Sequence, residues 1–546
     1  MPARLCFPLA LVLLALAGCA QYSTVHRTDR PGDLAVTSRQ RALAADQQRQ
    51  RDPLARIGAY LQEADDARRD LAGNPQDAPR RSDYNFAVAR IIDVISKEKL
   101  TPWDRPIECP GPDGRIWRLR LTAPYPQPEY HPSNFEFTPS DRYDFRGKLV
   151  GERVVKQGLG APLVVESRNV DYVKLDRFAQ GNRLYYGFTA LAKMRGTDAE
   201  IVLLDPLSRE TVSMDGRTHE LAGDFQGPLA LALAELHPRR RELAGFFSPQ
   251  KFEDRVRLAR LQPYDPRKIP VLFIHGLTNS PATWAPVVEF LRGDPNIRKN
   301  YQFWYFSYPT GLPYPLTAAM LRKQLAEIRK KYPGHKDIVV IGHSMGGMIS
   351  RMLVTDSGMK LWNTFFDRPP DQLPFSEETR RMMMGSLVFK PVPNIRRVIF
   401  VSASHRGSGM ATDIFGRLGA AIIGEPIAEE QVYLQASAHL RPELRSGRGR
   451  LPNSVDLLDP ENPFLRTLDT LPVSSRVPFH SLIGDRGRGG FIDRAKPQSS
   501  DGIVPYWSSH MPGAQSERVI PSGHWSHLHP LGMVELNRIL VDHLRN

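Results

Sequence analysis

Apolar and polar positions follow different patterns along the chain, and these patterns divide it into segments. Apolar residues fall at helical spacing from Pro53 and again over residues 82–96, so residues 51–100 are expected to form helices. Short apolar runs separated by turn residues come next, at 116–121, 149–155, 163–166, 183–190 and 200–204. They predict a small β-rich accessory region over residues 101–262, and its proline-rich start indicates an irregular surface segment.

A second pattern begins at Ile269. Residues 269–274 are a continuous apolar run, of the kind buried on both faces of a parallel sheet. Strand-like runs then alternate with helical patterns, with strands expected at 301–307, 338–341, 398–401, 479–483 and 519–520 and helices at 321–332, 345–354 and 533–544. This alternation predicts an α/β fold with a doubly wound, mostly parallel sheet over residues 263–546. Two longer stretches, about 356–390 and 410–476, interrupt it and are expected to be cap insertions.

The N-terminus carries a targeting pattern. Arg4 precedes an apolar run over residues 9–16, which is too short to be a good spanning helix. The run ends in Leu-Ala-Gly-Cys, an order typical of bacterial lipoprotein signals; an ordinary secretory signal is the alternative. We expect residues 1–18 to be a signal peptide, Cys19 to carry lipid such as palmitate, and residues 19–50 to be a polar tether. Ala20 in place of an aspartate favours the outer membrane of the cell envelope over the inner one.

Composition narrows the class of partner. Hydrophobic residues make up 41% and charged residues 24%, as in ordinary globular proteins, and the net charge is +14. A basic balance predicts either a solvated surface or attraction to anionic lipid headgroups. No nucleic-acid partner is expected, because an exported lipoprotein seldom meets nucleic acid and no such motif is present. With Cys6 in the signal and Cys19 lipidated, Cys109 has no disulfide partner, and no Cys/His cluster predicts a metal site.

One short motif predicts nucleophilic catalysis. Gly342-His343-Ser344-Met345-Gly346 fits Gly-x-Ser-x-Gly, directly after an apolar strand and at the start of a helical pattern. A sharp strand-to-helix turn exposes the serine hydroxyl, and only small neighbours permit the close backbone approach that the turn needs. We therefore expect Ser344 to be a nucleophile.

A serine hydroxyl needs a base, and the base needs an acid to orient it. In a fold of this kind the acid and then the histidine follow the serine along the chain. Asp501, in the loop after a late strand, is the expected acid, and Asp485 is the alternative. His524 is the expected base because it is the first histidine after the last strand, with His527 as the alternative and His529 as a helix-entry residue.

Two backbone N–H groups are expected to form an oxyanion hole, which stabilises the negative oxygen that develops during acyl transfer. One is the N–H of Met345, just after the nucleophile. The other is the N–H of Leu277, in the loop that follows the first buried strand. His275 begins this loop and is expected to stabilise it, because a base on this side of Ser344 would have the wrong chain order.

Several motifs together carry a family resemblance. They are His275-Gly276-Leu277, Pro281-Ala282-Thr283-Trp284, Tyr308-Pro309-Thr310-Gly311, Gly342-His343-Ser344-Met345-Gly346-Gly347, Ser500-Asp501-Gly502-Ile503-Val504-Pro505 and Gly523-His524. Over about residues 265–546 the chain resembles the lipase/esterase branch of the α/β-hydrolase superfamily, as found in bacterial lipoproteins. The resemblance implies carboxylic-ester hydrolysis through an acyl-enzyme, in which Ser344 attacks, His524 moves the proton and Asp501 orients His524. It implies no cofactor. The arginine- and glycine-rich stretch between Gly484 and Asp501 departs from the compact family pattern.

The sequence is compatible with three functions. The leading hypothesis is an esterase or lipase that acts on a lipid or small acyl ester at the cell envelope, held to the membrane through Cys19. A transferase, thioesterase or amidase would use the same three side chains. A non-catalytic envelope scaffold is the third possibility. Residues 51–262 carry no motif that assigns them a function.

Overall fold

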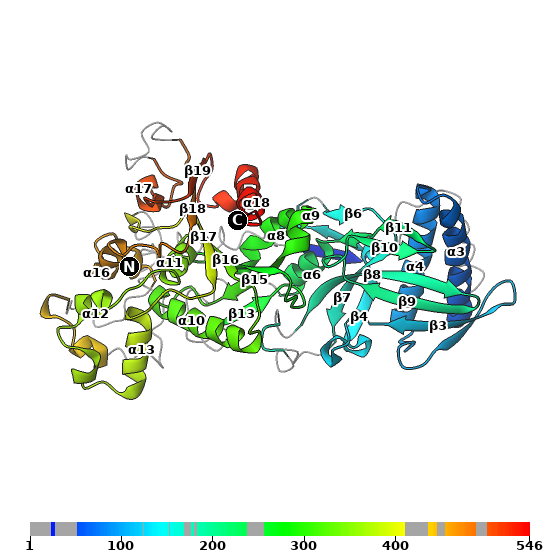
Figure 1. Ribbon diagram of the computed structural model, residues 1–546, viewed down its shortest axis with the longest axis horizontal. Coiled ribbons are helices and arrows are strands. Elements are labelled where there is room, and N and C mark those ends of the chain that lie inside the picture. The colour runs from blue at the N-terminus through cyan, green and yellow to red at the C-terminus, as the bar shows by residue number, and fades with distance from the viewer. Residues whose placement is uncertain are drawn as a thin grey trace, which may run out of the picture.

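The computed structural model describes most of the chain. It covers residues 23–27, 52–123, 125–151, 153–168, 176–179, 183–236, 256–409, 435–444, 454–487 and 499–545. The predicted signal peptide, Cys19 and most of the predicted tether lie outside the described residues. Figure 1 shows two bodies along the long axis, one from the first half of the chain and one from the second half. Within the described ranges, no helix combines the length and apolar character that crossing a bilayer requires.

The N-terminal body is a six-stranded sheet covered by two helices. Its strands, in spatial order, are β2 (Ile107–Pro110), β3 (Ile116–Thr122), β9 (Asp198–Leu204), β8 (Tyr185–Arg195), β7 (Ala161–Ser167) and β4 (Phe135–Pro139). Only β3 and β9 pair in parallel. Buried and exposed residues alternate along β3, because one face of the sheet packs under helices while the other is solvated. The predicted β-rich region is therefore confirmed.

The covering helices are α3 (Pro53–Gly73) and α4 (Ala78–Lys97). Each starts with an aspartate that caps the helix, Asp52 through the N–H of Leu54 and Asp77 through the N–H of Arg80, followed by proline in the first turn. Their buried faces form one hydrophobic core with the sheet. Cys109 is fully buried in this core, and burial raises the pKa of its thiol to about 12, which keeps the thiol unreactive.

Smaller elements complete this body. They are β1 (Thr24–Arg27), β5 (Tyr143–Arg146), β6 (Val155–Lys156), β10 (Thr211–Met214), β11 (Arg217–Glu220), β12 (Gly223–Asp224) and α6 (Gly227–Leu236). β1 pairs with β5, so this part of the predicted tether is joined to the accessory region. The strand expected over residues 149–155 forms only as β6, at its end, and the proline-rich start contains β2.

The C-terminal body is built on a seven-stranded sheet. Its spatial order is β13 (Arg257–Arg260), β15 (Tyr301–Ser307), β14 (Ile269–Ile274), β16 (Ile338–His343), β17 (Ile395–Val401), β18 (Phe479–Gly484) and β19 (Ser516–Ile520). Every neighbouring pair is parallel except β13 with β15. The predicted doubly wound, mostly parallel sheet is confirmed. It begins at β13, before the expected boundary at residue 263.

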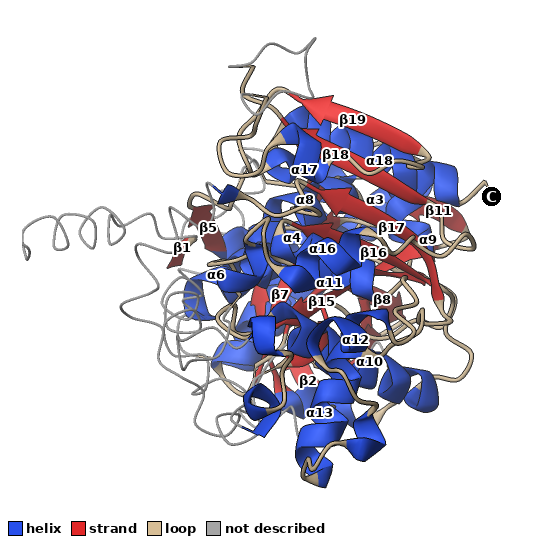
Figure 2. Cartoon of the chain, turned by 90° about the vertical axis from the view of Figure 1, so that its left-hand side faces the viewer, coloured by secondary structure: helices blue, strands red, loops and turns tan. Residues whose placement is uncertain are grey.

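Helices cover both faces of this sheet, as Figure 2 shows. One face packs against α8 (Ala285–Gly293), α9 (Pro295–Asn300) and α18 (Pro530–His543). The other packs against α10 (Tyr314–Lys331) and α11 (Met345–Met352). The crossover from β14 to β15 runs on the first face and the crossovers from β15 to β16 and from β16 to β17 on the second, so the winding reverses at β14. In open α/β sheets, ligands bind at the carboxyl ends of the strands beside such a reversal.

The two stretches that interrupt the alternation are helical where the structure describes them. Residues 356–390 hold α12 (Lys360–Phe365) and α13 (Glu377–Leu387), and residues 454–476 hold α16 (Pro463–Asp469). Their apolar side chains extend the core on the α10 and α11 face. Residues 410–434 and 445–453 lie outside the described part of the second stretch.

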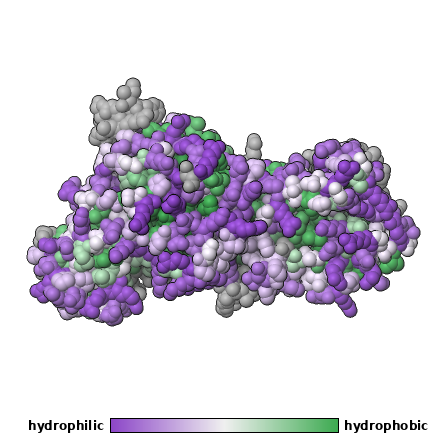
Figure 3. Space-filling view, viewed as in Figure 1, coloured by the Kyte–Doolittle hydropathy of each residue, from purple (hydrophilic) through white to green (hydrophobic). Residues whose placement is uncertain are grey.

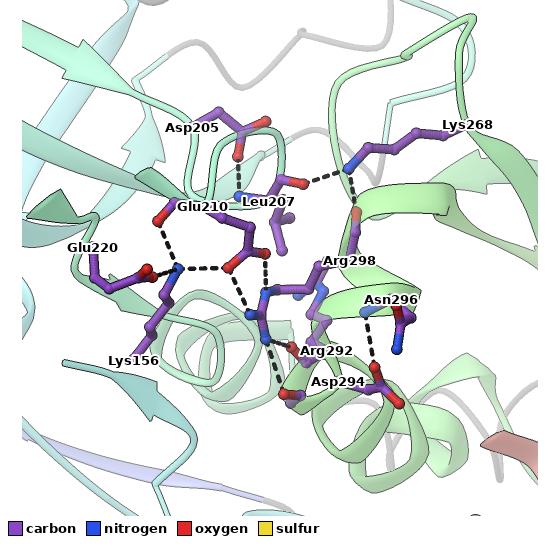
Figure 4. A network of polar contacts seen from close by, with 11 residues as sticks. Lys156, Asp205, Leu207, Glu210, Glu220, Lys268, Arg292, Asp294, Asn296 and Arg298 are labelled. Atoms are coloured by element: carbon purple, nitrogen blue, oxygen red, sulfur yellow. Dashed lines mark hydrogen bonds and ion pairs between the residues drawn. The ribbon is translucent and has the colours of Figure 1, made fainter. Parts of the chain in front are cut away.

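A buried polar network joins the two bodies (Figure 4). Arg298 of the C-terminal body has a side chain only 4% exposed, and its Nε and Nη2 each donate to a carboxylate oxygen of Glu210, at 2.9 Å. Lys156 binds the same carboxylate from within the N-terminal body. Lys268 donates to the carbonyl oxygens of Leu207 and Arg298, and so bridges the junction a second time. Arg298 and Lys268 are buried and take partners from the N-terminal body, so they hold the two bodies in a specific geometry.

Candidate active site

The turn between β16 and α11 holds Ser344 in a strained conformation. Ser344 has φ 55° and ψ −123°, a region that a residue with a side chain seldom adopts and that costs roughly 1–3 kcal/mol. Its N–H donates to the carbonyl of Val401 on the neighbouring strand at 2.9 Å, which holds the turn in place. A Cβ on Gly346 would collide with the carbonyl oxygen of Ile274, so glycine is required there. The small residues around Ser344 thus permit the sharp turn that presents its hydroxyl.

Three predicted side chains meet at the carboxyl edge of the sheet. His524 Nε2 lies 2.9 Å from Ser344 Oγ, and His524 Nδ1 lies 2.7 Å from Asp501 Oδ2. The other carboxylate oxygen of Asp501 accepts the N–H groups of Ile503 and Val504, at 2.8 and 2.7 Å. All three side chains are buried, with Asp501 only 1% exposed. The arrangement can pass a proton from the serine hydroxyl to an imidazole that a fixed carboxylate orients.

The alternative residues lie near this chain of hydrogen bonds but outside it. Asp485 is fully buried and accepts from the N–H of Gly487 at 2.7 Å and from the hydroxyl of Ser499 at 3.0 Å, so it closes the base of the loop that carries Asp501. His527 Nε2 lies 3.3 Å from the hydroxyl of Thr283. His529 caps the N-terminus of α18, as expected for a helix-entry residue.

Three buried histidines surround the site, and burial disfavours their charged forms. Burial lowers the pKa of His275 to about 4 and that of His527 to about 3, and it holds the pKa of His343 well below its ordinary value. His275 stacks on Tyr308, whose hydroxyl donates to the His275 carbonyl at 2.5 Å. His275 therefore stabilises its loop, as expected.

His343 has a contact that the sequence pattern did not predict. Its Nε2 lies 2.9 Å from the backbone carbonyl oxygen of His524, and its Nδ1 has no partner in the described structure. A neutral ring that carries its proton on Nε2 donates to this carbonyl and so positions the backbone of His524. The motif Gly-x-Ser-x-Gly leaves its second residue undefined, so no local signal could have identified this role.

The loop expected to form half of the oxyanion hole lies against the nucleophile. A Cβ added to Gly276 would stand 2.9 Å from Ser344 Cβ, so the loop that continues into Leu277 follows the serine closely. The N–H of Thr278, the residue after Leu277, is held by Thr310 Oγ1 at 3.2 Å. Met345 is the first residue of α11, where backbone N–H groups point out of the helix and favour negative charge.

Part of the second insertion crosses the rim of this site. Ser454 Oγ lies 2.6 Å from the carbonyl oxygen of Thr310, in the loop after β15. Four residues later, the carbonyl of Leu458 accepts the N–H of Ser408, in the loop after β17, at 2.9 Å. Residues 454–458 therefore span the carboxyl ends of the strands on both sides of β16, the strand that leads to Ser344. This is the position expected of cap material.

In the described ranges, no group of three or more His, Cys, Asp or Glu side chains is arranged to hold a metal ion. The predicted lipidation residue, Cys19, lies outside those ranges.

Comparison with known proteins gives one family match and several similar solved structures. Residues 271–536 match the model of the alpha/beta hydrolase family. Solved structures similar to this chain include Bacillus licheniformis lipase BlEst2 in its mature form, at 16% identity over 52% of this chain and 97% of that one, with a TM-score of 0.32. A lipase-esterase related protein from Clostridium acetobutylicum shares 11% identity over 53% and 98%, with a TM-score of 0.27. The Vlm2 thioesterase domain shares 15% identity over 52% and 96%, with a TM-score of 0.26. No curated protein matches the chain.

Proposed function

Because its C-terminal domain belongs to the α/β-hydrolase superfamily, we propose that this protein is a serine hydrolase that cleaves carboxylic esters through an acyl-enzyme. The observation that carries the proposal is the unbroken chain of hydrogen bonds from Ser344 through His524 to Asp501. A buried carboxylate, an imidazole and a serine in this order form the arrangement that activates a hydroxyl for acyl transfer. The proposed substrate is a lipid or another acyl ester.

In the first step, Ser344 Oγ attacks the ester carbonyl carbon while His524 Nε2 takes the hydroxyl proton. The carbonyl oxygen becomes an oxyanion, which the N–H groups of Leu277 and Met345 stabilise. The carbon–oxygen bond to the alcohol then breaks, and the His524 imidazolium gives its proton to the departing alkoxide. Asp501 keeps Nδ1 protonated and stabilises the imidazolium without taking the proton itself.

In the second step, water attacks the acyl-enzyme. His524 removes one proton from this water, and the new tetrahedral intermediate collapses to release the carboxylic acid. The proton returns to Ser344 Oγ, so the enzyme regains its starting state and no cofactor is consumed. The burial of all three side chains excludes bulk water and strengthens the electrostatic interactions among them.

Labelling with a fluorophosphonate probe tests this proposal without knowledge of the substrate, because the probe reacts with activated serines. We expect the wild-type chain to be labelled and Ser344→Ala to be unlabelled. Ser350→Ala is a matched control, since Ser350 is a fully buried serine of α11 that donates to the carbonyl of Gly346. Hydrolysis of p-nitrophenyl esters should follow the same pattern. A wild-type chain that is neither labelled nor active on any ester would refute the proposal and favour a non-catalytic scaffold.

The place of action is a further part of the proposal. Lipidation of Cys19 would hold the enzyme at the cell envelope, on the outer membrane, where acyl esters of membrane lipids are abundant. Metabolic labelling with an alkyne analogue of palmitate should modify the wild-type chain and leave Cys19→Ser unmodified, while a soluble wild-type chain without label would overturn this part.

A further inference from the structure

Apolar side chains gather on one outer face beside the predicted base. Among the described residues, seven large hydrophobic side chains are exposed, and four of these lie on α8, on α18 or in the loop before α18. They are Phe290 (37% exposed), Trp525 (46%), Leu531 (43%) and Val534 (54%), and we call them the α18 face. Figure 3 shows hydrophobic side chains at the surface where Figure 1 places α8 and α18.

Contacts between the two helices bring these residues to the same side. The rings of Trp284, just before α8, and His527, just before α18, lie 4.6 Å apart. Ten residues further along the chain in both segments, Asn537 of α18 donates to Asp294, at the C-terminal end of α8, at 2.9 Å. The helices therefore run side by side in the same direction. Phe290 and Val534 each lie about one turn before the second contact, so they stand at the same level along the pair of helices.

The α18 face lies next to the candidate active site. The ring of Trp525 contacts the ring of His524, at 5.9 Å between centroids. Residues 525–534 contain no aspartate, glutamate, lysine or arginine, in a chain of which 24% is charged. A run without charge on an exposed helix start is unusual for a surface facing only water, where charged residues interrupt apolar patches.

A cation lies near the residue that precedes His524 in the chain. The guanidinium of Arg486 packs against the backbone of Gly502 and Gly523, the residues next to Asp501 and His524, and the side chain is exposed. Of the two chain neighbours of His524, Gly523 thus lies against an exposed arginine and Trp525 is itself exposed. This combination matches a phospholipid surface, whose anionic headgroups attract arginine and whose interface accepts amphipathic tryptophan rings.

The geometry points to the α18 face as a docking surface for anionic phospholipid membranes, which would place Ser344 beside esters held in a lipid layer; this rests on the proposed function. A second copy of the chain fits the face less well. The exposed parts of four such side chains total roughly 300 Å², far below the roughly 800 Å² that each partner contributes to a stable protein dimer. A lipid layer needs no such area, since a few inserted side chains and one cation suffice for reversible binding.

Vesicle flotation tests the inference. The chain is used from residue 20 onward, which removes the predicted anchor and keeps every residue that the structure describes, and it carries Ser344→Ala so that lipid stays intact. We expect it to bind vesicles of two parts phosphatidylcholine and one part phosphatidylglycerol. Leu531→Ser with Val534→Ser should weaken binding at least about tenfold. Arg486→Gln should reduce the preference for vesicles that contain phosphatidylglycerol over those of phosphatidylcholine alone.

The N-terminal body offers a matched control. Ile116 and Val155 are 46% and 44% exposed, so Ile116→Ser with Val155→Ser removes similar apolar surface far from the site. This double variant should bind vesicles as the parent chain does. Equal binding by the α18-face variant and its parent, or equal weakening in the control, would overturn the inference. A dimer in solution that the α18-face variant converts to a monomer would assign the face to a second copy instead.

A separate measurement distinguishes failure of the inference from failure of the proposed function. In the chain with Ser344 intact, the α18-face variant should keep wild-type hydrolysis of soluble p-nitrophenyl acetate and lose hydrolysis of vesicle phospholipid. Normal vesicle hydrolysis by that variant would overturn the docking surface and leave the esterase proposal standing. Absence of fluorophosphonate labelling in the wild-type chain would overturn the esterase proposal, whereas the flotation result does not depend on it.

Discussion

Two buried aspartates follow β18, and replacing each by asparagine separates the acid of the site from its neighbour. Asp501 and Asp485 are 1% and 0% exposed, and asparagine has nearly the same shape as aspartate. In Asp501→Asn, the side-chain oxygen should remain with the two backbone N–H groups that Asp501 Oδ1 now accepts. The amide nitrogen must then face His524 Nδ1, where Oδ2 now lies at 2.7 Å.

That exchange reverses the hydrogen bond to the histidine. The amide donates to His524 Nδ1, so the neutral ring carries its proton on Nε2 and cannot accept the proton of Ser344. The corresponding substitution in a serine protease lowers kcat about 10⁴-fold, and we expect a loss of 10³- to 10⁴-fold here, or about 4–5.5 kcal/mol of transition-state stabilisation. The free energy of unfolding should change by about 1 kcal/mol, because every polar atom keeps a partner.

Asp485→Asn should change the stability by a similar amount but leave most of the activity. The hydroxyl of Ser499 can turn to accept from the new amide, and the N–H of Gly487 keeps its oxygen, so the loop stays closed. We expect kcat within about tenfold of the wild type and a loss of stability of about 1 kcal/mol.

The wild type and the two variants are compared in two ways. Initial rates on p-nitrophenyl butyrate and rates of fluorophosphonate labelling measure the loss of activity, and thermal unfolding measures the loss of stability. Large loss of kcat in Asp485→Asn together with near-normal Asp501→Asn would refute the assignment. Equal loss in both variants with equal loss of stability would show that the loop matters only as structure.

Three further predictions concern stability. Gly346→Ala should abolish fluorophosphonate labelling and lower the melting temperature, because a Cβ has no space there. Gly385→Ala, in the last turn of α13 with only a side-chain methyl 3.6 Å away, should be neutral or stabilise by up to about 1 kcal/mol. Equal effects of the two substitutions would contradict the steric argument. Burial lowers the pKa of His275 and His527 to about 4 and 3, so below about pH 6.5 the unfolded chain binds protons more readily than the folded chain. Each histidine should therefore remove about 2 kcal/mol of stability between pH 6.5 and 5, which chemical denaturation at the two pH values measures. If His527→Gln left the dependence of stability on pH unchanged, the contribution assigned to His527 would be wrong. Glu210→Gln should destabilise the protein by about 2 kcal/mol, measured by urea denaturation. This is less than the 3–5 kcal/mol typical of breaking a fully buried ion pair, because the carboxylate of Glu210 is one-third exposed. An unchanged urea midpoint would show that the ion pair of Glu210 with Arg298 does not stabilise the protein.

The central strands were predictable because a parallel strand buried on both faces has a continuous apolar sequence, as residues 269–274 have. The strand-to-helix turn at Ser344 was also readable, since glycines mark places where backbones approach closely. Chain order then led to Asp501 and His524, which the structure brings within hydrogen-bonding distance of each other and of the serine.

The elements that sequence patterns missed depend on distant partners. β13 is an edge strand of four residues that forms against β15, where paired residues are 44 to 50 positions apart. β1 forms against β5, where paired residues are 116 to 122 positions apart. The contact of His343 with the His524 carbonyl joins residues 181 positions apart. The pattern of a few neighbouring residues shows which face of a helix or strand is apolar. It does not show which side chain from a distant part of the sequence will contact that face.

The junction at Glu210 and Arg298 has a consequence for the order in which the protein is made. Synthesis proceeds from the N-terminus, so the body that carries Glu210 is complete before β14 is made. The hydrolase domain therefore folds against a surface that already exists and offers a carboxylate where Arg298 must be buried. A gene fragment that starts at residue 256 would lack that template, and its product should accumulate as aggregate even though it encodes Ser344, Asp501 and His524.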